Sequence, residues 1–133
     1  GVTVDGATAR DGYIINKPTP TAVNTSATIT AAQLLAGVIT STSAAPVTVT
    51  LPTVASIVAV LGNARGSSFD FVIDNTLGAS TVTVALDASI TQLVSVPDGG
   101  AGLLTVAASA TLGVGIFRMY FYSATAAVIS RIA

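Results

Sequence analysis

Aspartates are the first residues to test for chemistry, because they supply every acidic side chain of the 133-residue chain: Asp5, Asp11, Asp70, Asp74, Asp87 and Asp98. Two carboxylates that face each other across a cleft can act as general acid and base. Asp70 and Asp74 come nearest to such a pair, but they lie four residues apart on one face of a predicted strand, about 13 Å from each other. That spacing favours a solvated strand face over catalysis. Asp87 and Asp98 flank predicted turns, where aspartate commonly bonds the local backbone.

The other residue types needed for common catalytic and metal sites are missing. The chain has no histidine and no cysteine, which excludes Ser-His-Asp and Cys-His nucleophiles. No two aspartates lie within three residues of each other, so a calcium loop is not predicted. Gly113 and Gly115 lack the third glycine of a dinucleotide loop, and the run at 99–102 lacks the Lys-Ser/Thr of a phosphate loop. We therefore expect no catalytic residue, no cofactor and no metal, and no enzyme.

Binding residues are also sparse. The five basic side chains form no stripe, so nucleic-acid binding is not predicted: Arg10, Lys17, Arg65, Arg118 and Arg131. Tyr13, Tyr120 and Tyr122 could form a platform on which a sugar stacks. For Tyr120 and Tyr122, which fall on a long predicted strand, a place in the core or at a subunit interface is the more common outcome. No run reaches the ~20 apolar residues of a transmembrane helix, so no membrane is expected as a partner.

The elements that must position these residues are mostly strands. Alternating apolar residues predict strands at 38–41, 47–51, 67–75, 81–86, 90–96, 103–107, 111–122 and 126–132. We expect 67–75 and 81–86 to pair antiparallel through a hairpin at 75–80, and a turn at 97–100. Gly113 and Gly115 share one face of their strand, which indicates close approach of a bulky neighbour or another backbone.

Two short helices interrupt the strands. Thr30 and Gln33 are spaced as a capping box, and Gly37 is placed to end the first helix in a left-handed conformation. In the second helix Val54, Ile57, Val58 and Leu61 fall on one face, and Pro52 suits its first turn. About eight short strands and two short helices predict an all-β dominated fold, a β-sandwich of jelly-roll-like topology.

The composition predicts a surface that is covered by neighbours. Only 8% of residues are charged and the net charge is −1, against about 25% charged residues in an average soluble domain. Residues 1–27 differ, because they hold several charges and two prolines. We expect an extended N-terminal arm over 1–27, not a packed element, and a β-sandwich domain over 28–133.

Residues 28–132 resemble a module of virion structural proteins of tailed phages. The resemblance is carried by TITAAQLLAGVIT, VTVTLPT, a short Ala/Val helix, SFDFVIDN and STVTVAL. It is similar to small capsid decoration (cement) proteins and to capsid- or tail-associated β domains. What it implies is a protein of the virion, on the capsid surface, that binds the major capsid protein and stabilises the lattice without catalysis. It also implies a homotrimer whose arm contacts the lattice.

Two other binding roles stay open at the level of sequence. A receptor-binding or adhesin domain of a phage tail fibre or spike would need an exposed aromatic or Asp/Asn-lined pocket. A self-assembling surface protein or pilin-like subunit would need an open, head-to-tail interface. Composition does not separate these roles from the decoration protein, but the number of copies in each particle does.

Overall fold

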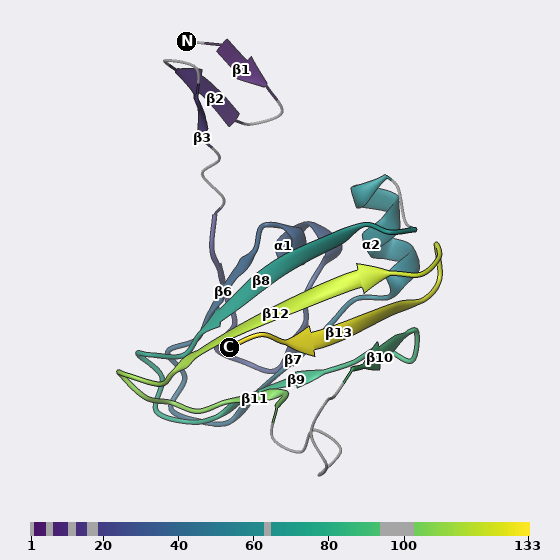
Figure 1. The fold of residues 1–133 in the computed structure, drawn as a ribbon. Helices are drawn as coiled ribbons and strands as arrows, with labels where there is room; N and C mark the ends of the chain where they lie inside the picture. Colours follow the sequence, from purple (N-terminus) through teal and green to yellow (C-terminus); the bar gives the residue numbers. More distant parts are fainter. Residues whose placement is uncertain (1, 5–6, 11–12, 16–18, 63–64, 94–102) are drawn as a thin grey trace.

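The fold is dominated by strands, which form two large sheets around a single apolar core and a third, small sheet near the N-terminus (Figure 1). This computed structural model describes residues 2–4, 7–10, 13–15, 19–62, 65–93 and 103–133. One large sheet has the order β10–β13–β12–β8–β6–β4, and the other has the order β11–β9–β7–β5. The six strands of the first are Thr21–Ala22 (β4), Val38–Thr40 (β6), Ser68–Asp74 (β8), Ile90–Gln92 (β10), Val114–Phe121 (β12) and Ala127–Arg131 (β13). The four of the second are Ala27–Thr28 (β5), Val47–Thr50 (β7), Val82–Ala85 (β9) and Thr105–Val106 (β11).

From β4 to β9 the chain winds in coils, because consecutive strands alternate between the two sheets. Strands β4, β6 and β8 are parallel neighbours in the six-stranded sheet, and β5, β7 and β9 are parallel neighbours in the four-stranded sheet. Helix α1 (Ala31–Leu35) connects β5 to β6, and α2 (Val54–Leu61) connects β7 to β8. Helix α1 packs beside α2 and against β6 and β8. Each coil therefore runs from the six-stranded sheet to the four-stranded sheet and back. In the first two coils the return connection contains a helix.

The last strands continue the sheets in a different direction. Strand β12 pairs antiparallel with β8 and with β13, while β10 runs parallel to β13. Strand β11 pairs antiparallel with β9. Half of the described pairings are thus parallel. The sequence prediction of a strand-rich fold is confirmed as two mixed sheets with two helices, but the antiparallel pattern of a jelly roll is not confirmed.

The predicted hairpin between 67–75 and 81–86 is wrong. Strand β8 has β6 and β12 as its neighbours, and β9 lies in the other sheet between β7 and β11. The inward residues of both strands, such as Phe71 and Val82, belong to one core, so the two strands contribute to it from opposite sheets. Asn75 marks the crossing. Its buried side-chain amide donates hydrogen bonds to the carbonyls of Ser80 and Val106, both at 2.9 Å.

Helix α1 begins and ends as its residues predict, whereas α2 begins later than its proline suggests. The Thr30 hydroxyl accepts from the Gln33 N–H at 3.2 Å, and the Thr30 N–H donates to Oε1 of Gln33 at 2.9 Å, which completes the capping box. Gly37 follows α1 with φ +92°, as expected. Helix α2 is capped by Thr53, so Pro52 lies just before the cap and not within the first turn.

The N-terminal strands form their own antiparallel sheet, β1 (Val2–Val4), β2 (Ala7–Arg10) and β3 (Tyr13–Ile15). Figure 1 shows this small sheet apart from the rest of the chain, which we call the body (residues 19–133). The stretch expected to be an extended arm thus contains paired strands. Its last part, β4, already belongs to the six-stranded sheet through its pairing with β6.

The close approach predicted at Gly113, just before β12, and at Gly115 within it is confirmed. A Cβ on Gly113 would lie 2.3 Å from the carbonyl oxygen of Ser109. A Cβ on Gly115 would lie 2.7 Å from Cγ2 of Val106 in the opposite sheet and 2.9 Å from Cε2 of Phe117. Gly115 thus lets the two sheets approach each other at β11 and β12, and Gly113 makes room for the backbone of Ser109 and Asn75.

We predict that Gly115→Ala destabilises the protein by about 1–3 kcal/mol, because the added methyl group overpacks the contact with Val106. The measurement is equilibrium urea unfolding followed by far-UV circular dichroism. Leu112→Ala, a change at an exposed residue just before the same strand, serves as the control and should shift the midpoint much less. A Gly115→Ala midpoint equal to or above the wild-type value contradicts the packing argument.

Candidate binding surfaces

The described aspartates of the body accept hydrogen bonds from nearby residues. Asp70 lies opposite Arg118 across β8 and β12, and its Oδ1 accepts a hydrogen bond from Nε of Arg118 at 2.7 Å. Asp74 accepts from both the N–H and the hydroxyl of Thr76. Asp87 accepts from the N–H and the hydroxyl of Ser89. Asp5, Asp11 and Asp98 lie outside the described residues.

These bonds favour the charged form of each carboxylate. The hydrogen bond from Arg118 lowers the pKa of Asp70, and the hydroxyls of Thr76 and Ser89 lower the pKa of Asp74 and Asp87. A general acid at neutral pH needs a raised pKa, so none of the three is suited to donate a proton. Asp70 and Asp74 point to the same side of β8, as predicted, and do not face each other.

Arg131 has a structural role in the body. Its guanidinium donates to the carbonyl oxygens of Leu103 at 3.1 Å and Thr105 at 2.6 Å, and to that of Ala133 at 3.0 Å. The same group lies 5.5 Å from the ring centroid of Phe117. Arg131 therefore connects β13 of one sheet to the β11 region of the other.

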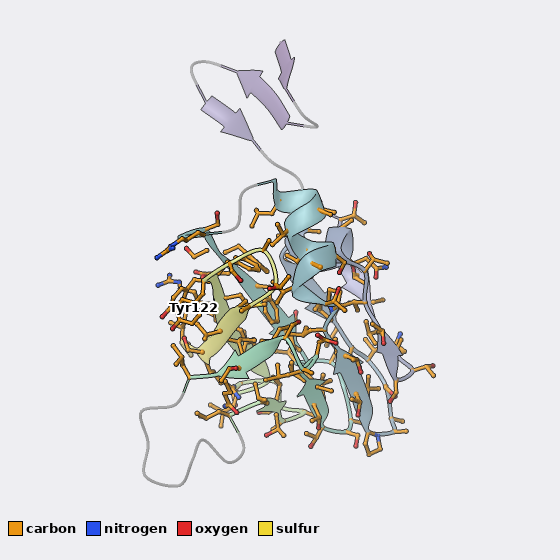
Figure 2. All side chains as sticks on the ribbon, turned by 90° about the vertical axis from the view of Figure 1, so that its right-hand side faces the viewer. Tyr122 is labelled. Carbon is orange, nitrogen blue, oxygen red and sulfur yellow. The ribbon has the colours of Figure 1, made fainter. Side chains whose placement is uncertain are left out.

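Tyr120 and Tyr122 lie on the outer side of β12, not in the core. Their rings meet edge to face with centroids 5.3 Å apart, and their hydroxyl oxygens lie 3.2 Å apart. The hydrogen bond between them raises the pKa of Tyr120. Tyr122 is 52% exposed, and Figure 2 shows it at the outer surface of the body.

These tyrosines belong to a mixed surface that we call the tyrosine face. It is the outward side of β8, β12 and β13 and consists of Asp70, Val114, Arg118, Tyr120, Tyr122 and Ile132. Val114 and Ile132 are large apolar residues that are 41% and 49% exposed. Ile132 adjoins β12, because its N–H donates to the carbonyl of Ile116 at 2.8 Å. Aromatic and aliphatic groups thus surround one ion pair.

A second surface lies where both sheets end at their first strands, and we call it the neutral end. It consists of β4, β5, the loop between them, and α1. A hollow of about 600 Å³ lies between β4 and α1, lined by Thr19, Pro20, Thr21, Ala22, Ala32, Gln33 and Ala36. An adjoining hollow of about 340 Å³ extends along 21–25 and 27–29, with Gln33 again in its lining. Residues 19–62 contain no Asp, Glu, Lys or Arg, so this end presents only neutral groups.

Within the described part of the chain, no group of three or more acidic, histidine or cysteine side chains is placed to hold a metal ion. No described helix is both long and apolar enough to cross a membrane. Comparison with protein-family models, with curated proteins and with solved structures gave no match. Evidence for a function therefore comes from the tyrosine face and the neutral end.

Sequence reasoning named Asp70, Arg118, Tyr120 and Tyr122 separately, and the structure brings them onto one face. It missed the neutral end, whose signal was the charge-free run of residues 19–62. The sequence alone does not show that part of this run forms one surface. The positions of β4 and β5 at the edges of the two sheets show it.

We predict that the Asp70 carboxyl titrates below its ordinary pKa of 3.8 and that Arg118→Gln moves the pKa back towards that value. The measurement is carbon-detected NMR of the carboxyl groups across acidic pH. Because the folded pKa is lowered, the ion pair adds stability above the ordinary pKa, and this contribution is lost as the pH falls through the lowered value. Asp87, bonded to Ser89, is the internal control. An Asp70 pKa that is unchanged in Arg118→Gln contradicts this assignment.

Proposed function

We propose that this chain is a non-catalytic structural protein of the virion, a capsid decoration protein that binds the major capsid protein on the capsid surface and stabilises the lattice. The single observation that carries the proposal is the neutral end, a charge-free surface that includes both large hollows. Charged residues are depleted at the cores of protein interfaces, because removing an unpaired charge from water is costly. A surface of threonine, alanine, proline and glutamine can be covered without that cost.

The position of the N-terminal sheet supports the same role. Strand β3 ends at Ile15, only a few residues before the body begins at residue 19, and Thr19 and Pro20 line the larger hollow. A subunit that docks through the neutral end would therefore hold its N-terminal sheet at the contact. Two contacts made by one chain reinforce each other through effective concentration, so a weak contact at each site is enough for a stable lattice.

The hydrogen bonds of the carboxylates suit a protein whose surface is buried in contacts with partner subunits. Asp74 and Asp87 are bonded by hydroxyls of neighbouring residues, and Asp70 is paired with Arg118. These groups keep partners when water is excluded around them, which lowers the cost of burial. As to fold, we propose that the two mixed sheets form a β-sandwich, and the jelly-roll-like topology stays a prediction.

The tyrosine face favours one alternative, a receptor-binding or adhesin domain of a tail fibre or spike. An exposed tyrosine beside an arginine–aspartate pair offers a ring on which a sugar can stack and polar groups for its hydroxyls. The two tyrosine rings meet edge to face, so they do not form one flat platform. We favour the decoration role because both hollows of the neutral end are lined only by neutral residues.

We predict a high copy number in purified particles of the source virus, measured by quantitative mass spectrometry against the major capsid protein. A decoration protein gives a ratio near one per capsid subunit, or one trimer at each lattice junction, because it repeats with the lattice. A ratio far below that moves the protein to a fibre or spike. Its absence from particles overturns the virion proposal.

We predict that Ala32→Glu, in the lining of the larger hollow, weakens binding to capsids that lack the protein by at least about tenfold, because the new carboxylate must lose its water in the contact. Ala32 is exposed on α1, so the fold should persist, which circular dichroism checks. Ala110→Glu is the matched control, the same exchange at an exposed site outside the neutral end. Equal occupancy of capsids by both variants contradicts a contact through this end.

A further inference from the structure

The tyrosine face has the composition of a protein interface. Tyr122, Val114 and Ile132 are between 41% and 52% exposed, although each is a large apolar residue. Tyrosine supplies a large contact area at a low cost in conformational entropy, and it is enriched at residues that dominate binding energy. The face lies on paired strands, and β12 at its centre is hydrogen-bonded on both sides. It is therefore a rigid surface that needs little ordering before it binds.

The charges of this face select the kind of partner. Arg118 and Asp70 are direct neighbours across β12 and β8, with side chains that are 54% and 44% exposed. One positive and one negative group thus lie side by side, and the pair has no net charge. A carboxylate can accept more hydrogen bonds than the two it receives from Nε and Nη2 of Arg118, and a guanidinium has five N–H groups to donate. Both groups can therefore bind a second pair of the same kind.

We propose that the tyrosine face binds the tyrosine face of a second copy of this chain across a two-fold axis that passes close to the Arg118–Asp70 pair. If the axis lies in the interface and runs perpendicular to the line from Arg118 to Asp70, the rotation reverses the order of the two charges, and Arg118 of each copy lies against Asp70 of the other. The four groups then form an alternating network, and the tyrosines and aliphatic residues cover it from both sides. This contact is isologous, because both copies use the same residues.

A basic or acidic protein fits this face less well than a second copy does. A partner with one sign of charge would attract one member of the pair and repel the other, whereas the copy matches both. The contact is separate from the neutral end and does not depend on the proposed role in a virion. A homotrimer, which the sequence resemblance implies, would use other surfaces. A two-fold contact therefore predicts oligomers with an even number of chains.

Charge reversal tests the contact in the full chain. Arg118→Glu makes both charges of the face acidic, and Asp70→Arg makes both basic, so each variant alone should self-associate at least about tenfold more weakly than the wild type. An equal mixture of the two variants should associate again, because each face now meets the opposite charges. The mass of each sample is measured by size-exclusion chromatography with light scattering, and the affinity by analytical ultracentrifugation.

Two further variants separate the contact from folding. The double variant Asp70→Arg/Arg118→Glu restores an ion pair within the chain and should associate as the wild type does. Val60→Glu adds a carboxylate at an exposed apolar residue of α2, outside the face, and should leave the mass unchanged. Circular dichroism confirms the fold of each variant.

The expected result is an even-numbered wild-type oligomer that falls to half its mass in each single variant and re-forms in their mixture. Three results would overturn the proposal. These are a wild-type chain that stays monomeric up to its solubility limit, single variants that keep the wild-type mass, and a mixture that associates no better than its components.

Discussion

The buried amide of Asn75 is the interaction on which the arrangement of the sheets depends. Its side chain donates to the carbonyls of Ser80 and Val106, and its N–H donates to the carbonyl of Gly113 at 2.6 Å. One residue thus holds the end of β8, the approach to β9, the end of β11 and the approach to β12. Gly78 and Gly113 leave room for Asn75, because a Cβ on either glycine would lie within 3 Å of an Asn75 atom. Loss of the amide would leave buried carbonyls unpaired, which costs about 1–3 kcal/mol for each group.

Local structure was predictable from the sequence, because neighbouring residues determine it. The capping box of Thr30 and Gln33, the alternation of Phe71 and Ile73, and the small residues at Gly113 and Gly115 each correspond to an observed contact. Pairing was not predictable, because the same alternation suits a hairpin and a crossing between sheets equally well. The difference lies in Asn75, whose sequence context indicates a turn but whose side-chain partners lie up to 31 residues away.

The candidate surfaces follow the same division. The tyrosines, the aspartate and the arginine of the tyrosine face were visible in the sequence, but their meeting depends on the register of β8 against β12, which places Asp70 opposite Arg118. The charges of the body all follow residue 62, and the first two coils are neutral. The chain thus separates a neutral end, built from its early residues, from a face with paired charges, built from its later residues.

The winding of the early strands also sets an order of assembly for the growing chain. Strands β4 to β9 can stack in the sequence in which they leave the ribosome, each on the coil before it, although parallel pairing between distant residues is slow to form. The apolar side of β8 is completed only by β12 and β13, the last strands to be made. Until then, Phe71 and Ile73 lack Phe117 and Ile129 as core neighbours. The nascent protein therefore exposes apolar surface of β8 until its last strands are made, and surface of this kind is prone to aggregate.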